Sequence, residues 1–166
     1  MRKILIIGSV ASGKTTLAKR LSKKAQIPWY ELDSIVYWHT EAGRIKRTPE
    51  QQVDVIREID KNGLWIFEGV YRKSYECLLD MADAIIFLDT PLWKRKLRIL
   101  FRFMKQQLGI EKCQYKSDLR MLRLMFQWTR EFEEGRESFE SMLLQYEGKL
   151  IRLSDNKNLD FINEIS

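Results

Sequence analysis

The sequence is poor in the residues that build metal centres and disulfide frameworks. Only two cysteines, Cys77 and Cys113, and one histidine, His39, occur among 166 residues. The cysteines form no C-x-x-C pair, so neither a zinc spacing nor a disulfide framework is expected, and we expect a cytoplasmic protein. With a single histidine, a Ser-His-Asp triad or a histidine-based metal site is not expected either.

Long apolar runs are also lacking. No stretch approaches the roughly 18 residues that a membrane-spanning helix needs, so we expect no membrane partner. Apolar residues make up 45% of the chain and charged residues 31%, which is the balance of a folded protein. The length suits one domain over residues 1–166, either a monomer or a homodimer.

Positive charge is in excess, and it is concentrated in one segment. Residues 92–136 contain 12 basic and five acidic residues, a net charge of +7, whereas the whole chain carries +6. A concentrated basic segment favours polyanionic ligands. This leaves nucleotide phosphates and nucleic acid as alternatives.

The clearest motif lies near the N-terminus. Gly8, Gly13, Lys14 and Thr15 match G-x-x-x-x-G-K-[ST], a phosphate-binding loop. The glycines permit a backbone curl whose N–H groups surround a phosphate, the lysine supplies charge, and the hydroxyl can bind Mg²⁺. We assign the whole loop to ATP binding: Gly8, Ser9, Val10, Ala11, Ser12, Gly13, Lys14, Thr15 and Thr16.

The flanking residues supply the context that this motif requires. Residues 3–7 form a short apolar, β-branched run typical of a buried parallel strand. Apolar residues recur at helical spacing after the loop, so a helix is predicted from about Gly13. The partial positive charge of its N-terminus favours a bound anion.

Strands and helices are predicted to alternate along the rest of the chain. Four further strands are expected at residues 28–32, 64–67, 84–88 and 149–153. Residues 34–47 look irregular, and helices are expected at about 48–61, 74–81, 91–107, 117–146 (one helix or two, with a kink at Gly135) and 159–165. This order predicts an α/β fold, a three-layer α/β/α sandwich with a five-stranded parallel sheet.

Acidic residues follow several of these predicted strands. Asp33, Glu68, Asp89 and Asp155 lie at or just beyond strand ends, where ligands bind in parallel sheets. We expect Thr15 and Glu68 to manage Mg²⁺. Asp33 can accept a proton from a substrate hydroxyl, although a plain turn residue is the alternative.

Arginines recur on one face of two predicted helices. Arg95, Arg98 and Arg102 are three and four residues apart, and Arg120, Arg123 and Arg130 share a face of the next segment. Phosphoryl transfer depends on positioning and charge neutralisation, so these side chains are expected to aim at a phosphate. The alternative is a solvated basic face.

Two further segments carry a resemblance to a known family. Residues 68–72, Glu-Gly-Val-Tyr-Arg, resemble the Asp-Gly-Phe-Pro-Arg that follows the third strand of adenylate kinases, and Leu88-Asp89-Thr90-Pro91 with the following arginines is similar to their fourth strand and lid-entry helix. The chain therefore resembles the nucleoside-monophosphate-kinase branch of P-loop proteins. The resemblance implies a metal-serving acid at Glu68, an acceptor-binding Arg72, an acceptor insert at about 34–63, a short lid at about 103–116 and an adenine-packing loop at 154–157.

A narrower pattern is similar to the bacterial subgroup labelled DNA topology modulation proteins. It comprises Leu32-Asp33, Tyr37-Trp38, residues 65–72 and residues 87–91. The chain departs from adenylate kinases at Tyr71, where they have proline, and it has no four-cysteine zinc site in the lid. These departures leave AMP as acceptor open.

These observations together predict an ATP- and Mg²⁺-dependent kinase whose acceptor is a nucleotide or nucleoside. The expected catalytic residues are Lys14, Asp33, Arg95, Arg98 and Arg130. The expected substrate-binding residues are Asp33, Trp38, Glu68, Tyr71 and Arg72. The alternative is an ATP-binding regulator that grips DNA through the basic segment 92–136; a fold that binds nucleotide without chemistry is disfavoured by the intact Lys14, Thr15 and Glu68.

Overall fold

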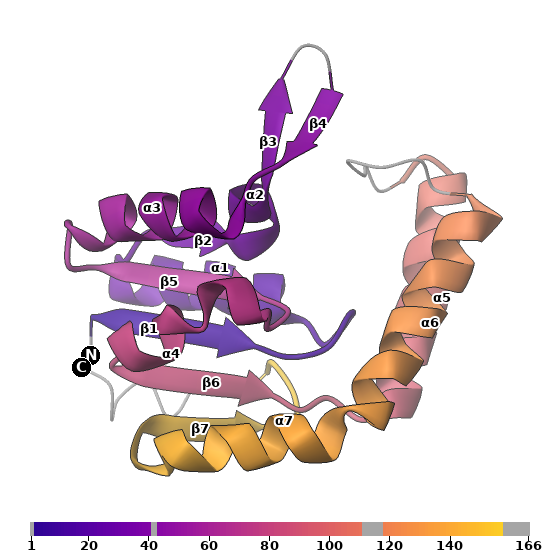
Figure 1. Ribbon diagram of the computed structural model, residues 1–166. Coiled ribbons are helices and arrows are strands. Elements are labelled where there is room, and N and C mark those ends of the chain that lie inside the picture. The colour runs from indigo at the N-terminus through magenta and orange to yellow at the C-terminus, as the bar shows by residue number, and fades with distance from the viewer. Residues whose placement is uncertain (1, 41–42, 111–117, 158–166) are drawn as a thin grey trace.

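The centre of the protein is a five-stranded parallel sheet. The computed structural model describes residues 2–40, 43–110 and 118–157 (Figure 1); the helix predicted at 159–165 and most of the break predicted at 109–115 lie outside them. The strands follow the order β2 (Trp29–Glu31), β5 (Trp65–Gly69), β1 (Lys3–Ile7), β6 (Ala84–Leu88) and β7 (Leu150–Leu153). The prediction of a parallel sheet is confirmed, and β1 lies in its middle.

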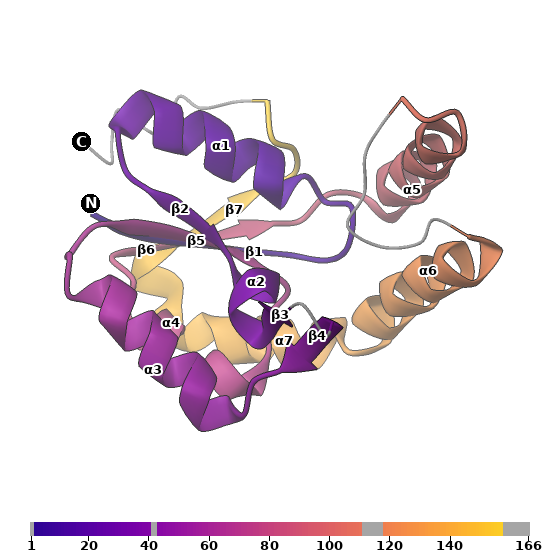
Figure 2. The same cartoon turned by 90° about the horizontal axis from the view of Figure 1, so that it is seen from above.

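Helices cover both faces of this sheet, which confirms the predicted three layers. Figure 2 shows α1 (Lys14–Ala25) on one face, and α3 (Pro49–Asp60), α4 (Cys77–Met81) and α7 (Arg136–Leu143) on the other. The side chains of β1 alternate between the two layers: Ile4 and Ile6 pack with α1, and Leu5 and Ile7 pack with the opposite helices. A strand buried on both faces must be apolar throughout, as this one is.

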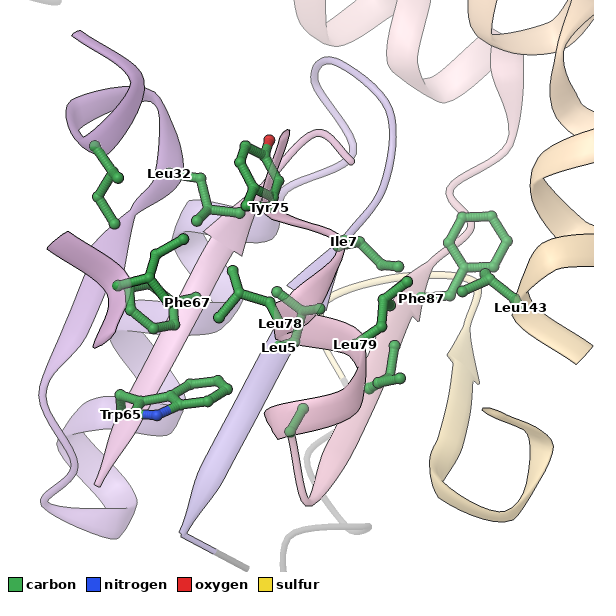
Figure 3. Packing of buried hydrophobic residues seen from close by; sticks show 14 of the residues in the cluster. Leu5, Ile7, Leu32, Trp65, Phe67, Tyr75, Leu78, Leu79, Phe87 and Leu143 are labelled. Carbon is green, nitrogen blue, oxygen red and sulfur yellow. The ribbon is translucent and has the colours of Figure 1, made fainter. Parts of the chain in front are cut away.

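The thicker apolar layer lies between the sheet and α3, α4 and α7. Figure 3 shows Phe67 and Phe87 of two strands with Leu78 and Leu79 of α4 between them. Trp65 is completely buried, and its indole N–H donates to Asp60 Oδ1 over 2.8 Å. This bond satisfies the one polar atom that burial of the ring would otherwise leave unpaired.

Two pairs of elements project from this body. The helices α5 (Leu92–Gln107) and α6 (Leu119–Glu134) pack side by side, and the hairpin β3 (Tyr37–Thr40) and β4 (Gly43–Lys46) stands apart from them (Figure 1). The predicted kink at Gly135 is confirmed as a break between α6 and α7. The residues after α7 form a short 3₁₀ segment, Leu144–Lys149.

The prediction that residues 34–47 are irregular is wrong. Leu32–Val36 form a short helix, α2, because Leu32, Ile35 and Val36 turn one buried face toward the core. The antiparallel β3–β4 hairpin follows, and its Gly43 has a φ of 125° that favours glycine. As a consequence Asp33 lies in the first turn of α2, not at the end of β2.

The predicted helix at 74–81 is also shorter than expected. A 3₁₀ turn over Lys73–Tyr75 precedes α4, so two short elements replace one helix. Tyr75 and Leu78 are both buried, and the backbone that places them in the core does not continue as one α-helix.

The start of α3 has a capping box. The backbone N–H of Gln51 donates to Thr48 Oγ1 over 3.3 Å, and the Thr48 N–H donates to Gln51 Oε1 over 3.0 Å. Pro49 occupies the first helical position, where no N–H is needed. The sequence signature Thr-Pro-Glu-Gln predicted this start, and the structure confirms it.

The Thr48 cap gives a stability prediction. Thr48→Ala should lower the free energy of unfolding by about 1 kcal/mol, because an N–H of the first turn loses its acceptor. Thr48→Ser keeps the hydroxyl and should stay close to the wild type. Urea unfolding followed by circular dichroism measures both variants; an equal loss in the two would show that the hydroxyl is not the stabilising group.

Candidate functional site

The phosphate loop, residues 8–16, crosses the carboxyl edge of the sheet between β1 and α1. Gly8 passes so close to β6 that a Cβ there would stand 2.7 Å from the Leu88 carbonyl oxygen. Gly13 has a φ of 101° and caps the N-terminus of α1. Both glycines are therefore required by the geometry: one by a close approach and the other by its backbone angle.

Lys14 points back into this loop. Its ammonium group donates to the Ser9 carbonyl oxygen over 2.8 Å, and the side chain is almost completely buried. Burial lowers the pKa of Lys14, and the negative charge of Glu68 opposes this shift. The loop thus holds a cation at its centre, where the phosphates of a nucleotide can pair with it.

Thr15 and Glu68 meet at the floor of the site. The Thr15 hydroxyl donates to Glu68 Oε1 over 2.6 Å, and Glu68 is 5% exposed. Burial raises the pKa of Glu68, while Lys14 and the Thr15 hydroxyl act in the opposite direction. The two residues come from α1 and β5, which the parallel pairing of β5 with β1 brings together.

This pair fits a magnesium ion. Mg²⁺ prefers oxygen ligands and is held by one or two protein groups together with water and substrate phosphates. The described residues contain no cluster of three or more His, Cys, Asp or Glu side chains that could cage a metal. A hydroxyl and a carboxylate beside a phosphate loop are the donor set that such a partly hydrated ion uses.

Asp33 and Arg72 form an ion pair near the phosphate loop's side of the sheet edge, separate from the Thr15–Glu68 hydrogen bond. Asp33 Oδ1 and Arg72 NH2 are 3.2 Å apart, with the side chains 58% and 38% exposed. The Nε atom of Arg72 is buried and has no hydrogen-bond partner among the described residues. The pair joins α2 to the segment after β5, so a solute here can reach both a carboxylate and a guanidinium.

Tyr71 and Trp38 lie apart from this pair. The Tyr71 hydroxyl donates to Glu76 over 3.2 Å, and its ring packs against Phe139; burial raises the pKa of Tyr71 to about 12. Trp38 is on the hairpin, 58% exposed, with the Arg47 guanidinium 6.0 Å from its ring centroid. The structure therefore places Tyr71 in packing contacts and Trp38 on a projecting surface.

A pocket of about 360 Å³ opens on the outer side of the loop. It is lined by Ala11, Gly13, Thr16, Arg98, Phe101, Arg102, Lys105 and Asn156. Asn156 belongs to the segment after β7, and its amide lies 3.5 Å from the Gly13 carbonyl oxygen. The pocket combines three cations with an aromatic ring and an amide next to the phosphate loop.

The arginines that helical spacing grouped together occupy different places. Arg98 donates to the carbonyl oxygens of Ala11 and Ser12, and Arg102 lines the same pocket. Arg130 is exposed on α6, where it pairs with Glu134 over 3.4 Å. Arg98 and Arg102 belong to α5 and Arg130 belongs to α6, so spacing within a helix does not reveal where each arginine lies in the fold.

Arg95 lies beneath the phosphate loop. The side chain is 1% exposed and donates to the Thr90 carbonyl oxygen over 2.8 Å, to Ser9 Oγ over 2.7 Å and to Glu133. It therefore ties α6, through Glu133, to the loop. Sequence reasoning missed the partners Ser9 and Glu133, because no local pattern signals a contact across 86 or 38 residues.

Asp89, another predicted strand-end acid, is part of an ion-pair network. Its two oxygens pair with Arg136 and Arg152, each over 2.8 Å, and both arginines also pair with Glu140. Burial acts to raise the pKa of Asp89, but the two guanidinium groups outweigh it and hold this pKa below its usual range. These contacts fasten α7 to β6 and β7 at the edge of the site.

Comparisons with solved structures show the same fold. A shikimate kinase from Acinetobacter baumannii in complex with shikimate has a TM-score of 0.58 at 14% identity, covering 99% of this chain and 90% of that one. An uncharacterized protein from Eubacterium ventriosum has a TM-score of 0.54 at 13% identity, covering 99% and 98%. The likeness at such low identity shows the fold alone, and it confirms the predicted three-layer α/β/α fold class.

Matches among curated proteins are confined to parts of the chain. The ATPase subunit HslU of an ATP-dependent protease from Beijerinckia indica is 33% identical over 88 residues, 53% of this chain and 19% of that protein. A shikimate kinase from Flavobacterium psychrophilum is 44% identical over 36 residues, 22% of this chain and 21% of that one. The chain thus spans about a fifth of the length of the curated relatives it matches.

A protein-family match covers the N-terminal half of the sequence. The profile of the PduV-EutP family, described as "Ethanolamine utilisation - propanediol utilisation", matches residues 1–88. This segment includes the phosphate loop, Asp33, Glu68 and Arg72, so the match takes in both the Thr15–Glu68 hydrogen bond and the Asp33–Arg72 ion pair. Since the match extends over more than half of the residues, the chain belongs to the PduV-EutP family.

Proposed function

We propose that this protein is an ATP- and Mg²⁺-dependent phosphotransferase that acts on a small molecule. The observation that carries the proposal is the arrangement of Lys14 and Glu68, both buried, with the Thr15 hydroxyl at the phosphate loop. A buried ammonium group and a hydroxyl paired to a carboxylate are the groups that phosphoryl transfer uses to position and neutralise charge.

The donor nucleotide binds along the loop and into the adjoining pocket. Backbone N–H groups and Lys14 hold its phosphates, while Phe101 and Asn156 offer a ring and an amide to the nucleoside part. Thr15 and Glu68 hold the magnesium ion, which when bound neutralises phosphate charge. The similarity over 88 residues to the ATPase subunit HslU of an ATP-dependent protease supports ATP as the nucleotide.

The acceptor binds at Asp33 and Arg72. Asp33 accepts the proton of an attacking hydroxyl, and Arg72 holds an anionic group of the acceptor, as the resemblance to nucleoside-monophosphate kinases implies. We propose a nucleotide or nucleoside as acceptor, with Trp38 of the hairpin available to stack on its base. Tyr71 helps by fixing the segment that carries Arg72, through its contacts with Glu76 and Phe139.

The basic helices supply charge at the loop and hold it in shape. Arg98 lies against the loop carbonyl groups and is the arginine that we propose for neutralising the transferring phosphate. Arg95 acts as a positioning residue, because its buried guanidinium group binds Ser9 of the loop. Arg130, the other arginine predicted to be catalytic, is exposed beside Glu134, and we propose for it only a secondary part in closing over the phosphate.

A DNA-bound regulator, as the topology modulation label suggests, is the weaker proposal. Two of the arginines counted in the basic segment, Arg95 and Arg136, are paired with carboxylates inside the protein, so they are already neutralised. ATP consumption measured with a panel of nucleotides, nucleosides and small hydroxylated acceptors, with duplex DNA as one arm, distinguishes the two. Stimulation by DNA alone would replace the kinase proposal.

Removal of the Lys14 ammonium group tests the donor site. Lys14→Ala should lower turnover by about a hundredfold or more, because the loop loses its central cation. Lys23→Ala, an exposed change in the last turn of α1, is the matched control and should stay near the wild type. Turnover under saturating ATP is the measurement, with circular dichroism to verify folding; undiminished turnover of Lys14→Ala would refute the assignment.

The Asp33–Arg72 pair gives a prediction for the acceptor site. Arg72→Ala should raise the acceptor KM about tenfold or more while it leaves the KM for ATP nearly unchanged. Asp33→Asn should lower kcat by about a hundredfold if the acceptor is a hydroxyl. Arg57→Ala, an exposed change on α3, serves as the control. Equal effects of Arg72→Ala on both substrates would place Arg72 outside the acceptor site.

The pH profile should report the titration of Glu68. Burial raises the pKa of Glu68 above its ordinary value of 4.5, so on acidification its carboxylate is lost at a higher pH than that of an exposed glutamate. We expect kcat/KM, which reports the free enzyme, to fall on the acid side in a limb that lies above pH 4.5.

Glu68→Gln should remove this limb and lower Mg²⁺-dependent turnover about tenfold or more. Glu58→Gln, an exposed change on α3, is the control and should keep the wild-type profile. An acid limb that persists unchanged in Glu68→Gln would assign the titration to another group.

A further inference from the structure

The outer face of α5 is apolar. Six large apolar side chains, five on this helix and one on its C-cap residue, are each between 41% and 73% exposed: Trp93, Leu97, Leu100, Phe101, Met104 and Leu108. At 3.6 residues per turn they fall within a sector of about 100° on the side opposite Arg95. We call these six residues the α5 stripe.

The stripe is not part of the buried core. The side chains of α5 that are buried, Arg95 and Ile99, are on its inner side, where Arg95 meets Ser9 and Glu133. Figures 1 and 2 both show α5 and α6 standing out from the sheet. A single exposed apolar residue needs no explanation, but a contiguous stripe along 16 residues indicates an interaction surface.

The charges that border the stripe are all positive. The helix contains six Lys or Arg residues and no Asp or Glu. Lys94 and Lys105 border one side of the stripe and Lys96 the other; the Lys94 ammonium group lies 5.6 Å from the centroid of the Trp93 ring. Long lysine side chains beside an apolar face can keep their charge in water while their stems lie on the apolar surface.

We propose that the α5 stripe binds the surface of an anionic lipid bilayer. A helix with Trp, Phe and Leu on one face and lysines along its borders is the kind that lies in the interface between headgroups and acyl chains. Acidic headgroups complement the lysine rim, and acyl chains accept the apolar centre. No helix among residues 2–40, 43–110 and 118–157 is long and apolar enough to cross a membrane, so this contact is peripheral.

The same charges argue against two other occupants. A second copy that packed α5 on α5 would bring the lysine rims of both copies together in a desolvated interface, which is costly. A nucleic acid offers phosphates to the rim but nothing to the apolar centre of the stripe. Phe101, at the edge of the stripe, also lines the pocket beside the phosphate loop. The proposal still goes beyond the phosphotransfer chemistry, because the other five residues of the stripe do not line that pocket.

Co-sedimentation of the full chain with lipid vesicles tests the proposal. The wild type should sediment with vesicles of phosphatidylcholine mixed with phosphatidylglycerol, and several-fold less with phosphatidylcholine alone or at high salt. Leu97→Glu/Met104→Glu should reduce binding about tenfold or more, because it puts two negative charges into the stripe. Leu144→Glu, at an apolar residue that is 66% exposed outside α5, is the matched control and should bind like the wild type.

A second variant changes the charge and leaves the stripe intact. Lys94→Gln/Lys96→Gln should weaken binding to the anionic vesicles several-fold and reduce its salt dependence, with Lys105 of the rim still in place. Circular dichroism and nucleotide binding measured on every variant show that the fold and the phosphate loop are unaffected. The emission of Trp93, obtained as the difference between the wild type and Trp93→Phe, should shift to shorter wavelength with vesicles.

Three results would overturn the proposal. One is a wild type that does not sediment with anionic vesicles. Another is vesicle binding that Leu97→Glu/Met104→Glu leaves intact. The third is a wild-type dimer, seen by light scattering, that this double variant converts to a monomer, since the stripe would then be the interface between two copies.

Discussion

The buried ammonium group of Lys14 is the constraint on which the rest of the site depends. A cation held inside a loop has to be compensated, and here a backbone carbonyl group and the nearby Glu68 carboxylate provide the compensation. Burial lowers the pKa of Lys14 and raises that of Glu68, so each charge is disfavoured alone and stabilised by the other. In the proposed function, a bound phosphate adds its negative charge to groups that the fold has already placed.

That placement follows from the central strand. β1 is bordered by β5 on one side and β6 on the other, so the loop that leaves β1 lies between the ends of both neighbours. Glu68 then stands beside Thr15, and the Leu88 carbonyl group presses against Gly8. Ligand sites of parallel sheets occur at this edge for the same reason. The apolar layers on both faces fix the strands and thereby the distances in the site.

The long basic helix α5 serves two surfaces at once. Its inner side carries Arg95 and Arg98 to the loop, and its outer side carries the α5 stripe. An arrangement with the fewest exposed apolar groups would place these side chains inside. Their outward position distinguishes α5 from the helices that cover the sheet, whose apolar faces lie in the core. A second distinction is that every charged residue of α5 is basic.

The sequence alone determined the features that depend on local chemistry. The phosphate loop, β1 and β6 with their bounds, the capping box of α3 and the break at Gly135 each follow from residues within a few positions of one another, and the alternation of elements gave the parallel sheet. The irregular assignment of residues 34–47 was wrong, because α2 and the hairpin are stabilised by burial of Leu32, Ile35 and Val36 against distant parts of the chain.

The tertiary structure alone decided which charges meet. Arg95 and Arg98 are both arginines on the same helix, three residues apart, yet Arg95 is buried against Glu133 and Arg98 borders the pocket. The partners of each arginine depend on packing between elements that lie far apart in the sequence.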